Sequence, residues 1–420
     1  MTVIELLRRR ADQPDPPGQG DAGGAAVDMS VDEAVEPAAR SGPAPYRWLL
    51  AVIVLLHVFG LVMVFSASSV QAIRDSGAGW YYFNRQLLFS FIGFCLLLVI
   101  LRVDYHWWRR QATALYLGGL FLLALVLAVG AEVNGSRQWL PLGPFNVQPS
   151  ELAKLTLLLF VASLLASRSD VMGDKRRTLN TSLLALAPAV LLVMLEPDLG
   201  SAIILTVIVI ATVFIAGVPL RPLAGIALVA VSMAALLAIV APYRRARLLG
   251  FADPWSDVRG VGYHTIQSMV GLATGGFTGT GLGESRAKWG FLPHAHSDFI
   301  FAIIGEELGM LGALLVLGLV CALAVLGFQA ALRAPDLFGT VVAGGITTWF
   351  VVQAFINIGG VVGLMPITGV TLPFVSFGGS SLLVSMVAAG ILLNIARQGR
   401  PLADAEDAVA VDDPEPQPRA

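Results

Sequence analysis

The sequence predicts an all-α polytopic membrane protein, with about ten transmembrane helices and a large extracytoplasmic loop between the seventh and the eighth. Three observations predict this class. The chain of 420 residues is 56% hydrophobic and only 13% charged, with a mean hydropathy of +0.75, which ordinary soluble domains do not reach. Apolar runs long enough to cross a bilayer recur along the chain. Basic residues gather in alternate connections between these runs.

The apolar runs lie between two polar tails. Residues 1–45 are rich in Gly, Pro, Ala and acidic residues without periodicity, and residues 399–420 are similarly polar and acidic. We therefore expect two disordered cytoplasmic tails around a transmembrane domain at 46–398. The expected spans within that domain are 47–67, 84–102, 111–131, 149–166, 180–195, 198–217, 222–241, 298–327, 338–364 and 379–396.

The distribution of basic residues orients the chain. With the N-terminus inside, each inner connection carries Arg or Lys, so both termini are expected in the cytoplasm. The same orientation places residues 243–297 outside, although this loop is also basic. Cations there indicate an anionic ligand such as a lipid head group, unless the long loop simply crosses regardless of its charge. The net charge of −2 and the lack of a long basic tract give no sign of a nucleic-acid partner.

The segment 281–309, GLGESRAKWGFLPHAHSDFIFAIIGEELG, carries the strongest candidate for chemistry. Asp298 stands where a glycine-rich, basic and aromatic stretch gives way to a long apolar run. An ionisable residue at the mouth of a membrane helix is costly and is by default a functional candidate. The alternative is that Asp298 only caps the helix. Two histidines at 294 and 296 precede it, but this pattern is weak evidence for a metal site.

Other expected outer segments hold further polar residues. Glu151 and Lys154 are three residues apart and can pair on one helix face, either within a site or as a purely structural ion pair. Arg85 at the start of the second span either joins the site or snorkels to the interface. Residues 365–381 contain prolines and glycines that break a helix, and such backbone is tolerated near a membrane only where protein buries it or where it lines a cavity.

Five stretches resemble the SEDS family (shape, elongation, division and sporulation proteins). They are NGSRQWLPLGPFNVQPSELAK at 134–154, EPDLG at 196–200, GYHTIQS at 262–268, the 281–309 segment and LPFVSFGGSSLL at 372–383. Several motifs in one order make the resemblance specific, and it covers about 46–398. The wording of the 281–309 segment and the long N-terminal tail resemble the division branch more than the elongation branch. His264, Glu196 and His294 depart from the residues usual in the family.

The resemblance implies a ten-span helical fold and a peptidoglycan glycosyltransferase that polymerises lipid II into β-1,4 glycan strands at the division septum of the bacterial inner membrane. It maps the family's essential acid onto Asp298, which we expect to act as the general base. No cofactor is expected; a divalent cation is conceivable but not predicted. The candidates for binding the pyrophosphate are Arg85, Arg137, Lys154, Arg244, Arg247 and Lys288, and the expected supporting residues are Glu151, Asp198, His296 and Glu306.

The expected partners are lipid II, a class B penicillin-binding transpeptidase and the division proteins FtsQ, FtsL and FtsB. Three alternatives remain open at this point. They are a flippase for lipid II, an elongation-type polymerase, and a division scaffold without catalysis. A flippase predicts inverted repeats and charges at mid-membrane depth, whereas the charges here concentrate on the expected outer face.

Overall fold

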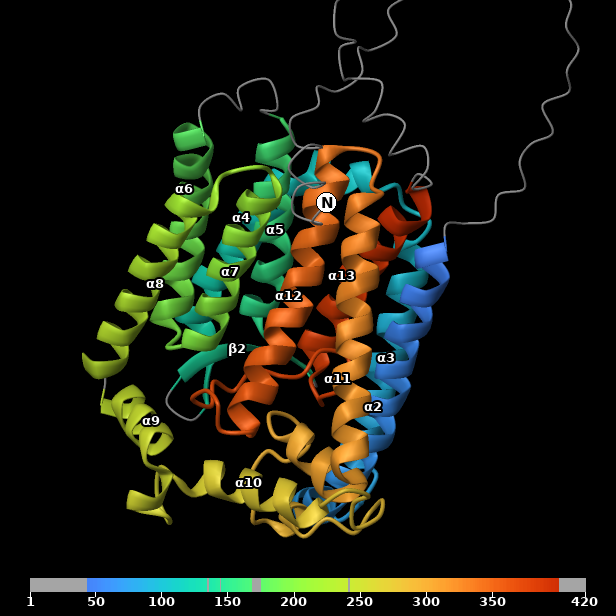
Figure 1. Cartoon of the computed structure of the whole chain (residues 1–420), viewed down its shortest axis with the longest axis vertical. Coiled ribbons are helices and arrows are strands. Elements are labelled where there is room, and N and C mark those ends of the chain that lie inside the picture. The colour runs from blue at the N-terminus through green and yellow to red at the C-terminus, as the bar shows by residue number, and fades with distance from the viewer. Residues whose placement is uncertain (1–43, 134–135, 144, 168–174, 241, 400–420) are drawn as a thin grey trace, which may run out of the picture.

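The computed structural model describes residues 44–133, 136–143, 145–167, 175–240 and 242–399, so the tails expected at 1–45 and 399–420 lie almost wholly outside the described residues. Figure 1 shows a bundle of long helices with smaller elements gathered at one end. The long helices are α2 (Ala44–Ser76), α3 (Tyr81–Ile100), α4 (Tyr105–Val129), α5 (Pro149–Ala166), α6 (Lys175–Leu195), α7 (Leu199–Ile215), α8 (Leu220–Val240), α11 (Ile300–Leu332), α12 (Leu337–Val361) and α13 (Gly379–Gln398).

The helical membrane fold is confirmed. In the described part of the chain, eight helices are long and apolar enough to cross a membrane. The apolar stretches Leu199–Ile215 of α7 and Leu220–Met233 of α8 are shorter. Every predicted span falls mainly on one of these ten helices. Hydropathy locates membrane helices well because a chain in lipid must satisfy its backbone hydrogen bonds within each segment.

Aspartate residues occupy the N-cap position of several helices. The Asp104 carboxylate accepts a hydrogen bond from the backbone N–H of His106 at the start of α4. Asp336 accepts one from Gly339 at the start of α12. A carboxylate at this position satisfies an otherwise unpaired N–H and interacts favourably with the helix dipole. These caps lie in polar connections, so they also set where the apolar helices begin.

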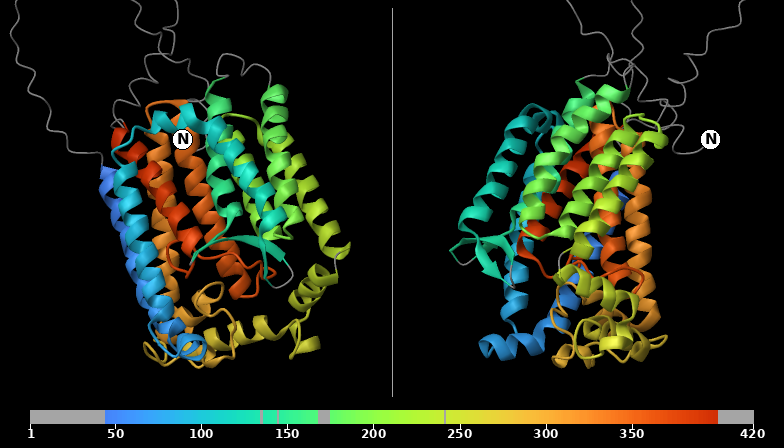
Figure 2. Two further views of the ribbon diagram at one scale, coloured as in Figure 1. Left: turned by 180° about the vertical axis from the view of Figure 1, so that it is seen from behind. Right: turned by 90° about the vertical axis from the view of Figure 1, so that its left-hand side faces the viewer.

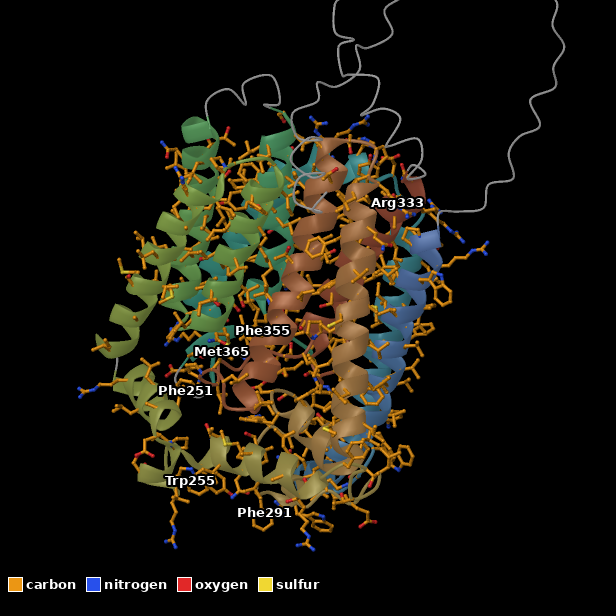
Figure 3. The ribbon with its side chains drawn as sticks, in the orientation of Figure 1. Phe251, Trp255, Phe291, Arg333, Phe355 and Met365 are labelled. Atoms are coloured by element: carbon orange, nitrogen blue, oxygen red, sulfur yellow. The ribbon has the colours of Figure 1, made fainter. Side chains whose placement is uncertain are left out.

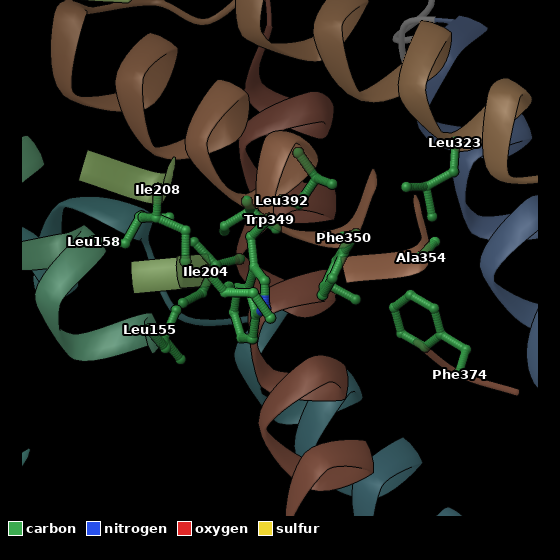
Figure 4. Packing of buried hydrophobic residues seen from close by; sticks show 14 of the residues in the cluster. Leu155, Leu158, Ile204, Ile208, Leu323, Trp349, Phe350, Ala354, Phe374 and Leu392 are labelled. Carbon is green, nitrogen blue, oxygen red and sulfur yellow. The ribbon is translucent and has the colours of Figure 1, made fainter. Parts of the chain in front are cut away.

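The centre of the bundle is formed by α5, α12 and α13, whose residues are mostly buried. Figure 4 shows the fully buried Trp349 of α12 among Leu155, Leu158 and Ile204. Helices approach closely here because one contact residue lacks a side chain. A Cβ added at Gly345 would lie 2.9 Å from carbons of Leu158 and Thr212. Small residues at crossings are the usual means of tight helix packing in membranes.

The bundle has two different ends. The first residues of α2 and the last residues of α13 lie at the same end, as Figures 1 and 2 show. The opposite end is covered by the segment between α8 and α11. The expected loop at 243–297 is therefore not plain coil, because it contains α9 (Pro242–Ala252) and α10 (Tyr263–Gly275) with the short 3-10 helices η2 (Pro254–Asp257) and η3 (Ala287–Trp289).

Two features were not predicted. A small antiparallel sheet, in the order β1-β2-β3, is formed by β1 (Ala131–Val133), β2 (Ser136–Leu142) and β3 (Phe145–Val147). Helix α11 is also broken at Gly309, where φ is 65°. Residues with a side chain rarely adopt that conformation, and glycine adopts it freely. The break separates a short opening helix, which starts next to Asp298, from the long membrane-spanning part.

Candidate functional site

Asp298 lies at the opening of α11, at the end of the bundle that carries α9 and α10. The N-cap position of α11 is occupied by Phe299, so the carboxylate does not cap the helix as the alternative interpretation proposed. Asp298 is half-buried. Within the described residues no basic side chain pairs with it at ion-pairing distance. An acid that is neither a cap nor paired is available for chemistry.

Asp298 lines a pocket between three segments of the chain. The end of α12 and the broken segment after it supply the other walls, and the empty volume is about 210 Å³ including its open mouth. Figure 3 labels Phe355 on α12, the residue before Ile356 of the lining, and Met365 just beyond the helix. The lining residues are Asp298, Phe299, Ile356, Asn357, Gly360, Val361, Ile367, Thr368, Gly369 and Val370.

Gly369 lines the pocket beside the Asp298 carboxylate. Its φ is +76°, and a Cβ added there would lie 3.7 Å from Asp298 Oδ2. A glycine is needed for the backbone conformation, and it also leaves the space beside the carboxylate open. The prediction that residues 365–381 do not form one continuous helix is confirmed, since α13 begins only at Gly379.

The electrostatics of the pocket act on Asp298 in two directions. Burial raises the pKa of Asp298 above its usual value, because a charge is poorly solvated there. Electrostatic interactions with His294 and Arg247 and a hydrogen bond from the Ser297 side chain oppose this shift. A carboxylate made more basic by burial, with neighbours that favour its ionised form, can act as a proton acceptor.

Arg247 is a predicted pyrophosphate ligand whose charge acts on the Asp298 carboxylate. It is exposed on α9, and its Nη1 donates a hydrogen bond to the Ile367 carbonyl at 3.3 Å. Ile367 lines the same pocket. The helix therefore presents a guanidinium at the pocket rim. Arg244 lies on the same helix, but its side chain is outside the described part of the structure.

His296 holds the approach to Asp298 in place. Its ring is buried and lies 4.7 Å from the ring of Tyr82 and 5.2 Å from that of Phe377. Its carbonyl accepts a hydrogen bond from Phe377 N–H. Burial lowers the pKa of His296 to about 4, so the ring is neutral at neutral pH. His296 thus contributes to this region by packing against aromatic rings.

Lys154 and Glu151 form the ion pair that their spacing predicted. Lys154 Nζ lies 2.8 Å from Glu151 Oε1, and it also donates to Gln353 Oε1 at 3.1 Å. The ammonium sits 5.6 Å from the centroid of the Trp349 ring. Both charged side chains are buried. Lys154 would have to exchange these partners to reach a phosphate.

Lys288 and the two glutamates of α11 form a second buried group, which we name the clamp: Ser66, Ser285, Lys288, Glu306 and Glu307. Lys288 Nζ lies 3.1 Å from Glu307 Oε1, and Ser66 of α2 donates to the same carboxylate. Glu306 accepts hydrogen bonds from the Ser285 hydroxyl and from the backbone N–H of Arg286 and Ala287. The clamp fastens the 283–288 segment to α11 and α2.

The remaining predicted residues lie apart from the pocket lining. Arg85 Nη1 donates to the Tyr81 hydroxyl at 3.2 Å in the first turns of α3. Arg137 on β2 is exposed and pairs with Glu132 at 3.5 Å. Asp198 caps α7 by accepting from Ser201 N–H at 2.9 Å. These contacts are structural or superficial, and none brings the side chain to Asp298.

Asn357 is the site residue that sequence reasoning missed. Its amide donates to the backbone carbonyls of Asp298 and Val370 and so joins two walls of the pocket. The signal was present, because a polar side chain inside a membrane helix is costly and therefore a functional candidate.

Comparison with known proteins identifies relatives along most of the chain. The family model for FtsW, RodA and SpoVE, described as cell cycle protein, matches residues 46–401. Stage V sporulation protein E of Bacillus subtilis is 41% identical over 359 residues, covering 85% of this chain and 98% of its own. The probable peptidoglycan glycosyltransferase FtsW of Aliivibrio salmonicida is 40% identical over 357 residues, covering 84% and 89%.

Solved structures agree with these relatives. A chain from a peptidoglycan synthase complex, in which polymerization and crosslinking are structurally coordinated, superposes with a TM-score of 0.70 at 32% identity, covering 83% of this chain and 97% of its own. The Rod shape determining protein RodA of Thermus thermophilus gives 0.63 at 31% identity, covering 84% and 97%. The matches to family, sequence and structure together show that this chain belongs to the SEDS family, the family of FtsW, RodA and SpoVE.

Proposed function

We propose that this protein is a peptidoglycan glycosyltransferase that polymerises lipid II into β-1,4 glycan strands. The observation that carries the proposal is the unpaired Asp298 carboxylate in a pocket with Arg247 at its rim. Relatives whose names state this activity cover most of the chain at about two-fifths identity.

The chemistry follows from these two groups. Asp298 takes the proton of the acceptor sugar's 4-hydroxyl, and that oxygen forms a bond to the anomeric carbon of the donor sugar. The bond from this carbon to the undecaprenyl pyrophosphate breaks, and the leaving group keeps the electron pair. One displacement converts the α-linked donor into a β-linked product, which fits a single base without a nucleophilic partner.

Cations must stabilise the departing diphosphate, and Arg247 is the first candidate because it stands at the pocket rim. Arg244 on the same helix and Arg85, Arg137, Lys154 and Lys288 remain candidates of lower rank. Lys154 and Lys288 already form buried ion pairs with Glu151 and Glu307, respectively. We propose that no cofactor takes part.

We further propose that the protein works at the division septum of the inner membrane, with both termini in the cytoplasm and the Asp298 end outside. The named FtsW relatives support the division role. The similar chain in a synthase complex supports a partner that crosslinks, and we propose a class B penicillin-binding transpeptidase. FtsQ, FtsL and FtsB are proposed as further division partners.

A gel assay tests the activity. The purified full-length protein is incubated with labelled lipid II, with and without its transpeptidase, and with or without EDTA. Glycan ladders that survive EDTA support the cofactor-free polymerase. Transfer of lipid II across vesicle membranes without polymer would instead identify a flippase. If neither polymerisation nor transfer is seen, the result supports a scaffold without catalysis.

A further inference from the structure

Asn357 occupies an unusual place for a polar side chain. It lies near the end of α12, in a helix whose residues are mostly apolar and buried, and it is only 5% exposed. Its neighbours on the pocket wall are Ile356, Gly360 and Val361. An amide buried among such residues must hydrogen-bond on both its nitrogen and its oxygen to be stable.

The nitrogen side of the amide is satisfied. Asn357 Nδ2 donates to the Asp298 carbonyl at 2.8 Å and to the Val370 carbonyl at 2.7 Å. Backbone carbonyls only accept hydrogen bonds, so these two contacts fix which end of the amide is nitrogen. The amide oxygen must therefore point away from both carbonyls.

The oxygen side is not satisfied. Within the described residues Asn357 Oδ1 is buried and has no hydrogen-bond partner. Asn357 lines the same pocket as Asp298, and the carboxylate there also has only acceptor oxygens when it is ionised. The lining of the pocket thus includes two residues with acceptor oxygens, and a ligand that brings donors suits it.

We propose that Asn357 is a substrate-binding residue whose Oδ1 accepts a hydrogen bond from a hydroxyl or acetamido N–H of the acceptor sugar held beside Asp298. The inference rests on the proposed function. A sugar supplies several donors, whereas a diphosphate supplies acceptors and negative charge and would be repelled by this wall. The diphosphate is therefore assigned to the Arg247 side of the pocket and the sugar to the Asn357 side.

The chain offers a matched control one turn earlier on α12. Gln353 is also a buried amide, and its Nε2 donates to the Thr371 carbonyl in the segment that Asn357 tethers. Its Oε1, however, already accepts hydrogen bonds from Lys154 and Trp349. Replacing Gln353 by Ala therefore removes a hydrogen bond to the Thr371 carbonyl, but it removes no acceptor oxygen that lacks a partner.

The test measures binding of lipid II to the full-length protein in nanodiscs, in an Asp298→Asn background that prevents turnover. Asn357→Ala, Asn357→Asp and Gln353→Ala are each combined with lipid II analogues in which the sugar hydroxyls and acetamido groups lose their hydrogen-bond donors one at a time. We expect Asn357→Ala to weaken binding of unmodified lipid II roughly tenfold. One analogue should bind the protein with Asn357 intact about as weakly as unmodified lipid II binds Asn357→Ala. That analogue should lose no further affinity when Asn357 is replaced by Ala.

Asn357→Asp keeps the acceptor oxygen but loses the two tethers, so it should retain the sensitivity to that analogue. Gln353→Ala should bind all analogues with the same relative affinities as the unsubstituted protein. The inference is overturned if every analogue and Asn357→Ala act additively. Should Asn357→Ala fail to elute as a monodisperse protein, Asn357→Ser takes its place. Absence of glycan ladders from the unsubstituted protein would reject the polymerase separately, since binding is measured without turnover.

Discussion

Two acidic regions at the opening of α11 use the same chemical group in opposite ways. In the clamp, Glu306 and Glu307 accept hydrogen bonds from serine hydroxyls, backbone N–H groups and Lys288. In the pocket, Asp298 lies just before α11, and its carboxylate has a hydrogen bond from the Ser297 side chain but no ion-pair partner within the described residues.

The contrast shows what distinguishes a structural acid from a reactive one here. Buried charge is tolerated when every oxygen has a donor, and the clamp then fixes the loop that leads to the pocket. An acid without an ion-pair partner can accept a proton from a substrate. The clamp thus fixes the loop that leads to Asp298, whose carboxylate is left without an ion-pair partner within the described residues.

The largest expected effect comes from Asp298. Asp298→Asn removes the base while keeping the shape, and polymerisation of lipid II should fall by about 10²–10⁴-fold. Initial rates of glycan formation measure this, with thermal unfolding to show that the fold is intact. Glu284→Gln changes an exposed acid in the same segment and serves as the control. A folded Asp298→Asn protein with the original rate would reject the base.

The clamp should respond in stability instead. Lys288→Met leaves Glu307 buried without its cation, which typically costs about 3–5 kcal/mol, so the midpoint of thermal unfolding should drop. Lys288→Met combined with Glu307→Leu should recover much of the loss, because the uncompensated charge is gone. If Lys288→Met were as stable as the parent and bound lipid II poorly, Lys288 would belong with the diphosphate ligands and the contrast would fail.

Arg247 sharpens the boundary between the two regions. Arg247→Gln removes a guanidinium at the pocket rim, and the rate with lipid II should fall roughly tenfold to a hundredfold without a large change in stability. Arg259→Gln alters an exposed arginine of the same 243–297 segment and should leave the rate near its original value. Equal losses in both variants would mean that the segment's overall charge matters and not one side chain.

Much of this molecule was predictable from local patterns. Spans follow from hydropathy, and the Glu151–Lys154 pair follows from a spacing of three within one helix. The small sheet was missed because two of its three strands have only three residues each and so carry little periodic signal.

The contacts that define the site join distant parts of the chain. Asn357 reaches a carbonyl 59 residues earlier, and Ser66 reaches a carboxylate 241 residues later. No spacing rule within one element predicts such contacts. The sequence identified which charged residues were unusual, but only the packing of α2, α11 and α12 shows which of them are saturated. Asp298 and Lys288 look equally functional until their partners are known.

Glu196 provides a test of the same contrast that is confined to one range of pH. It is fully buried just after α6, and within the described residues both of its carboxylate oxygens lack a hydrogen-bond partner. Burial raises the pKa of Glu196 to about 8, and the like charge of Asp198 adds to the shift. Within the described residues no group opposes that shift, whereas Arg247 opposes the shift at Asp298. The folded protein should therefore hold a neutral acid here at neutral pH.

The sign of the pH dependence follows. Below about pH 4.5 the group is protonated in both folded and unfolded chains, so its full stabilising effect is present. From there to about pH 8 the unfolded chain releases the proton and the folded chain keeps it, so stability falls by up to about 1.4 kcal/mol per pH unit. Glu196→Gln cannot ionise, and its unfolding midpoint should gain on the parent's as the pH rises from 5 to 8. A difference between Glu196→Gln and the parent that stays constant with pH would mean that Glu196 is solvated or paired in the folded protein.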